Sequence, residues 1–371
     1  MSAPSFATLS AAELDERILA FIEAWHTSRA VANEHEFGVL ARELFAYQVA
    51  ENAPYRAFVQ SVRGSLEAPD DWRQIPAVPA SAFKEATLAT FDIRRAEAEF
   101  HTSGTTQARA GRHYLERAAL YRASLLAGFD RFMLPDGARL AYLNLLPDAR
   151  TQPHSSLSFM MQVVGDERGV RPPAFYVQGE ELEVARFCDD LAALGRANTP
   201  VCITGTAFAF VALLDTFERQ GLRFTLPGAS RIMETGGFKG RVRSVERPAL
   251  YARLSEAFGI APQAIVAEYG MTELLSQYYD TPASRAGDAR IKVGPPWLRT
   301  VVVDAEGAEV AAGTIGFLRH VDLANRSSAI AIQTEDRGYT IGEGFVLLGR
   351  ETAAPLRGCS LNAEDLAARY D

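Results

Sequence analysis

The sequence predicts an α/β protein whose mostly parallel sheet is flanked by helices, with helices before it and a β-rich part after it. Short apolar runs alternate with helical stretches between about residues 113 and 270. Apolar residues recur at helical spacing in the first sixty residues, and a period of two begins after residue 290. Strands separated by helices need crossover connections, which join parallel neighbours. We expect segments 1–75, 76–289 and 290–371, together forming one continuous domain.

The same patterns place the individual elements. Later helices are expected over residues 115–133, 180–194, 207–220, 244–258 and 363–370. Buried strands are expected over residues 140–146, 201–204, 231–233 and 264–269. Further strands are expected over residues 291–293, 300–304, 315–321, 330–334 and 345–348, with turns at 305–307 and 335–338.

The composition limits the classes of function. Apolar residues make up 48% of the chain, which permits a packed core, and the net charge of −8 argues against nucleic-acid binding. Three cysteines without a C-x-x-C pair indicate neither a disulfide framework nor a zinc site. We find no secretory signal, and the apolar run Ala207–Leu214 is too short to cross a bilayer. We therefore expect a cytoplasmic protein without a membrane span.

A loop of small and hydroxylated residues is the most informative stretch. It comprises Thr102, Ser103, Gly104, Thr105 and Thr106, and it follows an alternating approach. Such a loop leaves backbone N–H groups open and adds hydroxyl donors, which suits phosphate binding. By itself, a Ser/Thr-rich surface loop is an equal alternative.

Several expected strands end in polar or Gly-rich residues. These endings are 204–206, 234–237 and 269–273. Because ligands of parallel sheets usually bind at the carboxyl ends of the strands, the endings predict one shared site.

Three separated segments resemble the acyl-adenylate-forming enzymes. Residues 102–106 resemble their phosphate loop, and 269–273 resemble their Tyr-Gly-x-Thr-Glu segment. Asp336 and Gly349-Arg350 resemble the positions that hold the nucleotide ribose. The short length, the segment 234–240 and the ending 349–361 resemble, more closely, the acyl-protein synthetase (LuxE) family, relatives of phenylacetate–CoA ligase. The resemblance implies the large domain of an adenylate-forming enzyme without the usual separate C-terminal subdomain.

The resemblance also implies an activity. A long-chain fatty acid is activated with ATP as acyl-AMP, carried on Cys359 and delivered to a fatty-acid reductase partner. A nearby cation, Arg357, and an expected helix start favour the Cys359 thiolate. By contrast, Cys202 lies in an apolar run and Cys188 lies beside two acids.

The resemblance assigns roles residue by residue. The nucleotide-binding set is Thr102, Ser103, Gly104, Thr105, Thr106, Gly236, Gly237, Tyr269, Gly270, Asp336 and Arg350. Thr272 would donate to the α-phosphate, and Glu273 would hold Mg²⁺. His154 falls where related enzymes place an aromatic residue or His near the carboxylate.

Each assignment has a structural alternative. Tyr269 could be a core aromatic, Glu273 a solvated helix-start acid and Asp336 a turn acid. Arg350 could cap a strand in an ion pair, and His154 could be a structural loop residue.

The chain departs from the resemblance at the phosphate loop. No Lys stands at the position where such loops carry one, and Arg109 or Arg112 could supply the charge instead. Two alternatives stay open: an acyl- or aryl-CoA ligase that uses free CoA, and a non-catalytic adenylation-fold subunit of a reductase complex.

Overall fold

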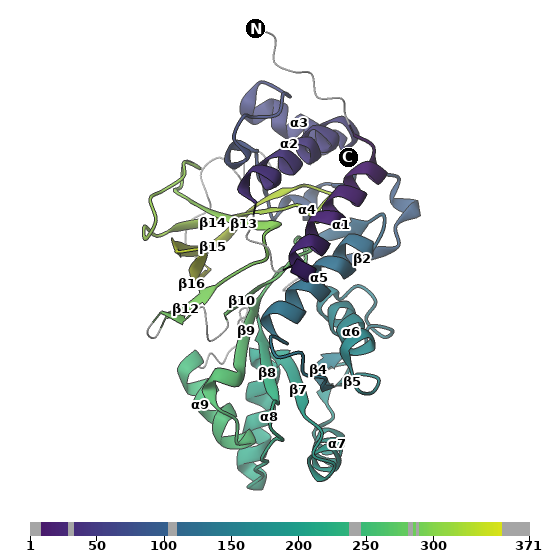
Figure 1. Cartoon of the computed structure of the whole chain (residues 1–371), viewed down its shortest axis with the longest axis vertical. Helices are drawn as coiled ribbons and strands as arrows, with labels where there is room; N and C mark the ends of the chain where they lie inside the picture. The colour runs from purple at the N-terminus through teal and green to yellow at the C-terminus, as the bar shows by residue number, and fades with distance from the viewer. Residues whose placement is uncertain are drawn as a thin grey trace. The chain divides into compact units, whose positions relative to one another are not determined.

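The computed structural model describes residues 9–28, 33–102, 110–236, 246–280, 285–286 and 289–350 (Figure 1). The chain divides into two compact units. Unit 1 comprises residues 1–128, 271–277 and 289–371, and unit 2 comprises residues 129–270 and 278–288. The segment boundaries expected from the sequence, near 75 and 290, stay a prediction.

Three helices open unit 1, as the helical spacing predicts. They are α1 (Ala11–Ser28), α2 (Glu34–Glu51) and α3 (Ala53–Arg63). The side chains of Asn33 and Asn52 accept backbone N–H bonds at the starts of α2 and α3. Gly64 ends α3 with φ +68°, a conformation that favours glycine.

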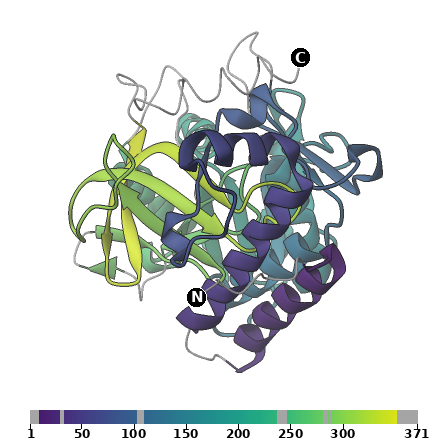
Figure 2. The same cartoon turned by 90° about the horizontal axis from the view of Figure 1, so that it is seen from above.

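A mixed sheet forms the other layer of unit 1. Its antiparallel strands follow the order β12-β16-β15-β14-β13, and β1 (Val78–Pro79) joins β15 in parallel. The bounds are β12 Ala289–Lys292, β13 Leu298–Val303, β14 Gly316–Asp322, β15 Ala331–Ile341 and β16 Gly344–Arg350. Figure 2 shows the purple N-terminal helices beside these yellow-green strands.

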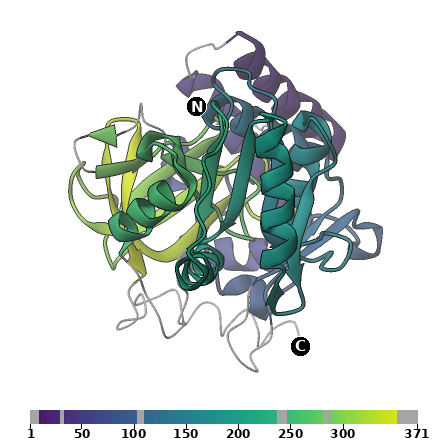
Figure 3. The same cartoon turned by 90° about the horizontal axis from the view of Figure 1, so that it is seen from below.

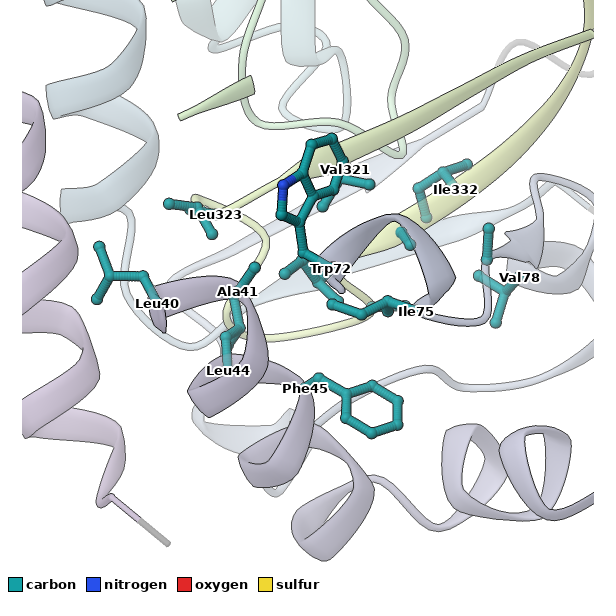
Figure 4. Close-up of a cluster of buried hydrophobic side chains, with 14 of the residues drawn as sticks. Leu40, Ala41, Leu44, Phe45, Trp72, Ile75, Val78, Val321, Leu323 and Ile332 are labelled. Carbon is teal, nitrogen blue, oxygen red and sulfur yellow. The ribbon is translucent and has the colours of Figure 1, made fainter. Parts of the chain in front are cut away.

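The core of unit 1 lies between these layers. Leu44 and Phe45 of α2 and the indole of Trp72 pack in one buried cluster with Val321 and Ile332 of the sheet (Figure 4). Burial of such side chains stabilises a fold by roughly 1.5–3 kcal/mol each.

The prediction of a turn at residues 335–338 is wrong. β15 continues to Ile341, and the chain reverses between Ile341 and Gly344. The Asp-Arg-Gly sequence stays within the strand, and its register with β16 shifts between Arg337 and Gly338, where the extra residue is Leu348 of β16. A Cβ at Gly338 would lie 2.2 Å from the Val346 carbonyl oxygen, so the close strand approach requires glycine.

Short elements complete unit 1. They are the 3₁₀ helices η1 (Trp72–Gln74) and η2 (Ile93–Arg95), the helix α4 (Ala82–Glu85) and the hairpin of β2 (Ala98–His101) with β3 (Arg112–Leu115). The helix α5 (Ala119–Phe132) contains the division between the units.

Unit 2 contains the predicted parallel sheet. Its order is β10-β9-β8-β7-β4-β5-β6, and β4, β5, β7, β8 and β9 run parallel. The bounds are β4 Ala141–Pro147, β5 Ala174–Gln178, β6 Glu181–Leu182, β7 Val201–Thr206, β8 Arg231–Thr235, β9 Ile265–Tyr269 and β10 Tyr278–Asp280. The short strand β11 (Arg285–Ala286) falls within the residues of unit 2 but does not belong to this sheet. The sequence did not predict β5 or β6.

Helices cover this sheet. They are α6 (Ser156–Arg168), α7 (Val184–Arg196), α8 (Ala207–Gln220) and α9 (Arg247–Phe258), followed by the 3₁₀ helix η3 (Pro262–Ala264). Apolar side chains of α7, α8 and α9 share one buried cluster with β4, β7, β8 and β9. Teal and green helices lie beside these strands in the view from below (Figure 3). The predicted α/β fold class is confirmed.

Among the described helices, none combines the length and apolar character needed to cross a membrane. The C-terminal helix expected over 363–370 lies outside the described residues.

Candidate active site

The structure describes nine of the candidate residues. Unit 1 carries Thr102, Thr272, Glu273, Asp336 and Arg350, and unit 2 carries His154, Gly236, Tyr269 and Gly270. Ser103, Gly104, Thr105, Thr106, Gly237 and Cys359 lie outside the described residues.

The β2–β3 hairpin brings together the two ends of the phosphate-type loop. The Thr102 N–H donates to the Gly111 carbonyl at 2.9 Å. The Gly111 N–H in turn donates to the Thr102 hydroxyl at 2.9 Å. We call this pair of residues the loop neck. The Thr272 hydroxyl donates to the carbonyl of His101, beside the neck, at 3.4 Å, so two segments of the expected site are adjacent.

Buried side chains hold the segment 271–277, which carries Thr272 and Glu273. The Asn325 side-chain amide donates to the Glu273 carbonyl at 2.8 Å. The Leu275 N–H donates to the Asp322 carboxylate at 2.9 Å, and the Ser276 hydroxyl donates to the same carboxylate at 2.7 Å. Glu273 is itself buried and lies outside any helix, so its alternative as a solvated helix-start acid is wrong.

His113 on β3 fixes the Thr272 carbonyl. Its Nδ1 lies 2.8 Å from that oxygen, and its Nε2 lies 2.8 Å from the Ser328 hydroxyl. Because a carbonyl only accepts, Nδ1 carries the proton and Nε2 accepts from Ser328. Complete burial lowers the pKa of His113 to about 4, despite the bond to Thr272, so the ring is neutral at pH 7.

Asp322 is the second buried titratable group in this arrangement. Burial raises its pKa to about 6, and hydrogen bonds from Ser276 and from the backbone of Ala324 and Leu275 oppose that rise. The sequence did not predict Asp322, Asn325 or His113 as residues of the site. The available signal was the dense polar run 322–328 between two expected strands, a pattern more typical of a surface turn.

Asp336 and Arg350 face each other across the β15–β16 hairpin. They are directly paired in register, and the Arg350 Nε lies 3.3 Å from an Asp336 oxygen. The Asp336 side chain is 16% exposed and the Arg350 side chain 54% exposed. Asp336 belongs to a strand, so its alternative as a turn acid is wrong, whereas the ion-pair alternative for Arg350 agrees with the structure.

In unit 2, two candidate residues end neighbouring strands. Thr235 of β8 pairs in register with Glu268 of β9, so Gly236 and Tyr269 occupy the next positions at the same edge of the sheet. The Thr235 hydroxyl also donates to the buried Glu268 carboxylate. Gly236 has φ +72°, and a Cβ there would meet no atom within 4 Å, so its need for glycine is conformational.

Tyr269 and His154 have different surroundings. Tyr269 is 9% exposed, and its ring centroid lies 6.0 Å from that of Tyr278. That packing agrees with its alternative as a core aromatic. His154 is exposed and directly precedes Ser155, whose hydroxyl caps α6.

The two described thiols are poor nucleophiles. Burial raises the pKa of Cys202 to about 11. Burial and then the Asp189 charge raise the pKa of Cys188. Since the thiolate is the reactive form, neither cysteine suits acyl transfer at neutral pH.

The fold is similar to that of adenylate-forming ligases of known structure. An open conformation of 2-hydroxyisobutyryl-CoA ligase, in complex with an acyl-AMP and CoA, matches with a TM-score of 0.62 at 17% identity, covering 96% of this chain and 82% of that one. ATP-bound MatB from Rhodopseudomonas palustris matches with a TM-score of 0.51 at 16% identity, covering 92% and 73%.

Sequence comparison defines the family. The long-chain-fatty-acid–luciferin-component ligase of Vibrio harveyi is 24% identical over an alignment of 338 residues, and the match covers 87% of this chain and 86% of that protein. The model of the acyl-protein synthetase, LuxE, family matches residues 9–366, and the chain belongs to this family. The predicted family and ligase class are thereby confirmed.

Proposed function

We propose that this ligase activates a long-chain fatty acid with ATP and transfers the acyl group to Cys359. The family match over residues 9–366 carries the proposal, and the name of the Vibrio harveyi relative supports the substrate class. That name also supports an acyl-reductase as the acceptor partner.

The first step joins the acid to AMP. A carboxylate oxygen attacks the α-phosphorus of ATP, and the bond to the pyrophosphate oxygen breaks. The products are acyl-AMP and pyrophosphate. The Thr272 hydroxyl exchanges its long bond to the His101 carbonyl for one to the α-phosphate, and the buried hydrogen bonds to Glu273 and Leu275 keep this segment in place. Groups fixed before the reaction stabilise developing charge without reorganisation.

Glu273 is suited to hold Mg²⁺. Mg²⁺ is commonly bound by one or two carboxylates together with substrate phosphates, and Glu273 is the carboxylate of the segment next to the loop neck. The ion would neutralise phosphate charge. By the sequence resemblance, Asp336 would accept from the ribose hydroxyls, with Arg350 on the same sugar. Tyr269 would stack on adenine, Gly236 and Gly270 would contact the nucleotide, and His154 would act near the carboxylate of the acid.

The second step transfers the acyl group to sulfur. The Cys359 thiolate attacks the acyl carbonyl carbon, and the bond to the AMP oxygen breaks. A thioester and AMP result. Ser103, Gly104, Thr105, Thr106 and Gly237 complete the proposed nucleotide contacts, on the basis of the sequence resemblance.

The test combines an exchange assay with intact mass spectrometry. The full-length protein is incubated with Mg²⁺, ATP and fatty acids of graded chain length, and acid-dependent pyrophosphate exchange is measured. We expect exchange, together with one acyl adduct per chain. The adduct should persist in Cys188→Ser, the matched control, and disappear in Cys359→Ser while exchange continues.

Other outcomes contradict the proposal. An adduct that survives Cys359→Ser places the acyl group elsewhere. CoA-dependent release of AMP by Cys359→Ser, at the wild-type rate, identifies a CoA ligase instead. Absence of exchange with every acid identifies a non-catalytic adenylation fold.

A further inference from the structure

The phosphate loop lacks the lysine that its sequence pattern leads one to expect, and the structure makes Arg112 a poor replacement. The Arg112 Nε lies 3.7 Å from Glu99, and its Nη1 lies 3.4 Å from the Tyr114 hydroxyl. Its side chain is 53% exposed. A guanidinium beside a carboxylate offers a polyphosphate a weaker positive potential than an ammonium without an acidic neighbour. Arg109 lies outside the described residues.

Lys84, on α4, lies against the loop neck. A Cβ built on Gly111 would lie 3.3 Å from the Lys84 Cγ and 3.2 Å from the Thr102 hydroxyl oxygen. The stem of Lys84 therefore passes beside Gly111, one of the two residues that close the loop. Two more methylene groups separate Cγ from the ammonium, so the charge can reach beyond the neck. Lys84 is half-buried, and within the described part of the chain its ammonium has neither a hydrogen-bond nor an ion-pair partner.

The packing of α4 fixes where this stem begins. Phe83 is buried, and its ring centroid lies 5.4 Å from that of His113. The same imidazole holds the Thr272 carbonyl on its other side. One buried ring thus sets the positions of both the Lys84 backbone and the proposed α-phosphate donor. The ammonium itself stays on a flexible stem, which suits a cation that follows phosphates through a reaction.

We propose that Lys84 is the cation that binds the β- and γ-phosphates of ATP and the departing pyrophosphate. This assignment rests on the proposed adenylation. Lys84 supplies from a separate helix the charge that the loop sequence omits. Its contact is with the polyphosphate, so AMP and acyl-AMP should bind independently of it.

Lysine footprinting tests the contact in the wild-type protein. The chain has three lysines, Lys84, Lys239 and Lys292, and Lys292 is 1% exposed, so mass spectrometry resolves each reaction site. Acetylation is measured with sodium pyrophosphate, ATP or AMP present. We expect ATP and pyrophosphate to slow acetylation of Lys84 several-fold and AMP to leave it unchanged. Equal acetylation of Lys84 with and without pyrophosphate overturns the assignment.

Variants give a second measurement. For Lys84→Gln we expect the KM for ATP and for pyrophosphate to rise about tenfold or more, since a charge-assisted hydrogen bond is lost. Acyl transfer from added acyl-AMP should be unchanged. Lys84→Arg should recover part of the loss, and Arg112→Gln, the matched control at the neck, should change the KM for ATP less than about twofold.

The proposed adenylation and the proposed role of Lys84 can be rejected independently. Wild-type protein without acid-dependent exchange rejects the proposed adenylation, and pyrophosphate protection then still decides whether Lys84 binds a polyphosphate. Normal exchange with an unchanged KM for ATP in Lys84→Gln rejects Lys84 alone.

Discussion

Two parts of unit 1 that carry candidate residues are built in opposite ways. The segment with Thr272 and Glu273 is held through its backbone by buried side chains, among them His113 and Asn325. Asp336, by contrast, meets a half-exposed Arg350 across the end of a hairpin. The first part is fixed by buried side chains, and the second is fixed by an ion pair in contact with solvent.

This difference indicates where the protein requires rigidity. Buried polar groups that lose a partner cost about 1–3 kcal/mol each, so the Thr272 segment has few alternative conformations. Surface ion pairs contribute about 0–1 kcal/mol, so Arg350 can exchange Asp336 for another partner with little loss. We infer that the proposed phosphate contacts are preorganised and that the proposed ribose contacts can adapt to the nucleotide.

The largest expected effect comes from removing the buried cation Arg326, which follows Asn325 in the chain. Arg326 is 1% exposed and donates to Asp15 and to Glu116, each at 2.7 Å. Arg326→Ala leaves two acids facing a cavity, and we expect the free energy of unfolding to fall by about 3–5 kcal/mol. Urea denaturation measures this loss. Arg17→Ala, which removes a surface pair with Glu43, is the control, with an expected loss below about 1 kcal/mol. Equal losses in the two variants would contradict the expectation that the buried ion pair matters more to stability than the exposed one.

A second substitution acts directly on the rigid segment. Asn325→Ala removes the donor to the Glu273 carbonyl and one acceptor of the Leu275 N–H. We expect a loss of about 2–3 kcal/mol in the free energy of unfolding. Pyrophosphate exchange should also show a lower kcat with a nearly unchanged KM for ATP, because the displaced groups act on the reacting phosphate. A rise in KM alone would argue against a preorganised segment.

The contacts that fix the rigid part are what the sequence revealed least. The pattern of apolar residues predicted α1–α3 and the parallel strands of unit 2, because local periodicity determines such elements. The motif 269–273 and the residues Asp336 and Arg350 could be found through their resemblance to known segments. The contact of His113 with Thr272 joins residues 159 positions apart, and no local pattern encodes it.

The continuation of β15 through residues 335–338 was missed for a related reason. Asp-Arg-Gly is typical of turns, and only the neighbouring strands make the chain continue through it. Asp336 therefore became a strand residue opposite Arg350, a pairing that the sequence alone could not predict.

A pH experiment tests the burial of His320 in the sheet of unit 1. His320, on β14, bonds Thr300 through Nδ1, and burial lowers its pKa to about 4, against an opposing effect of Asp336. The folded protein favours the neutral ring, so the unfolded chain binds a proton at higher pH than the fold does. The full stability is therefore present above the unfolded pKa of about 6.5 and is lost progressively as the pH falls toward 4. Between pH 7 and pH 5, His320→Gln should gain about 2 kcal/mol in unfolding free energy relative to wild type. Urea denaturation at both pH values measures this difference.

The smallest effect on stability is expected at the exposed pair. For Arg350→Gln we expect a change below about 1 kcal/mol in the free energy of unfolding, since the side chain is 54% exposed and solvent screens the pair. The KM for ATP should nevertheless rise severalfold, because the variant removes a proposed ribose contact. Asp336→Asn should raise it further, because the carboxylate is the acceptor for the ribose hydroxyls. The comparison of the two parts fails if Arg350→Gln destabilises the protein as much as Asn325→Ala, since the hairpin would then be as rigid as the buried segment.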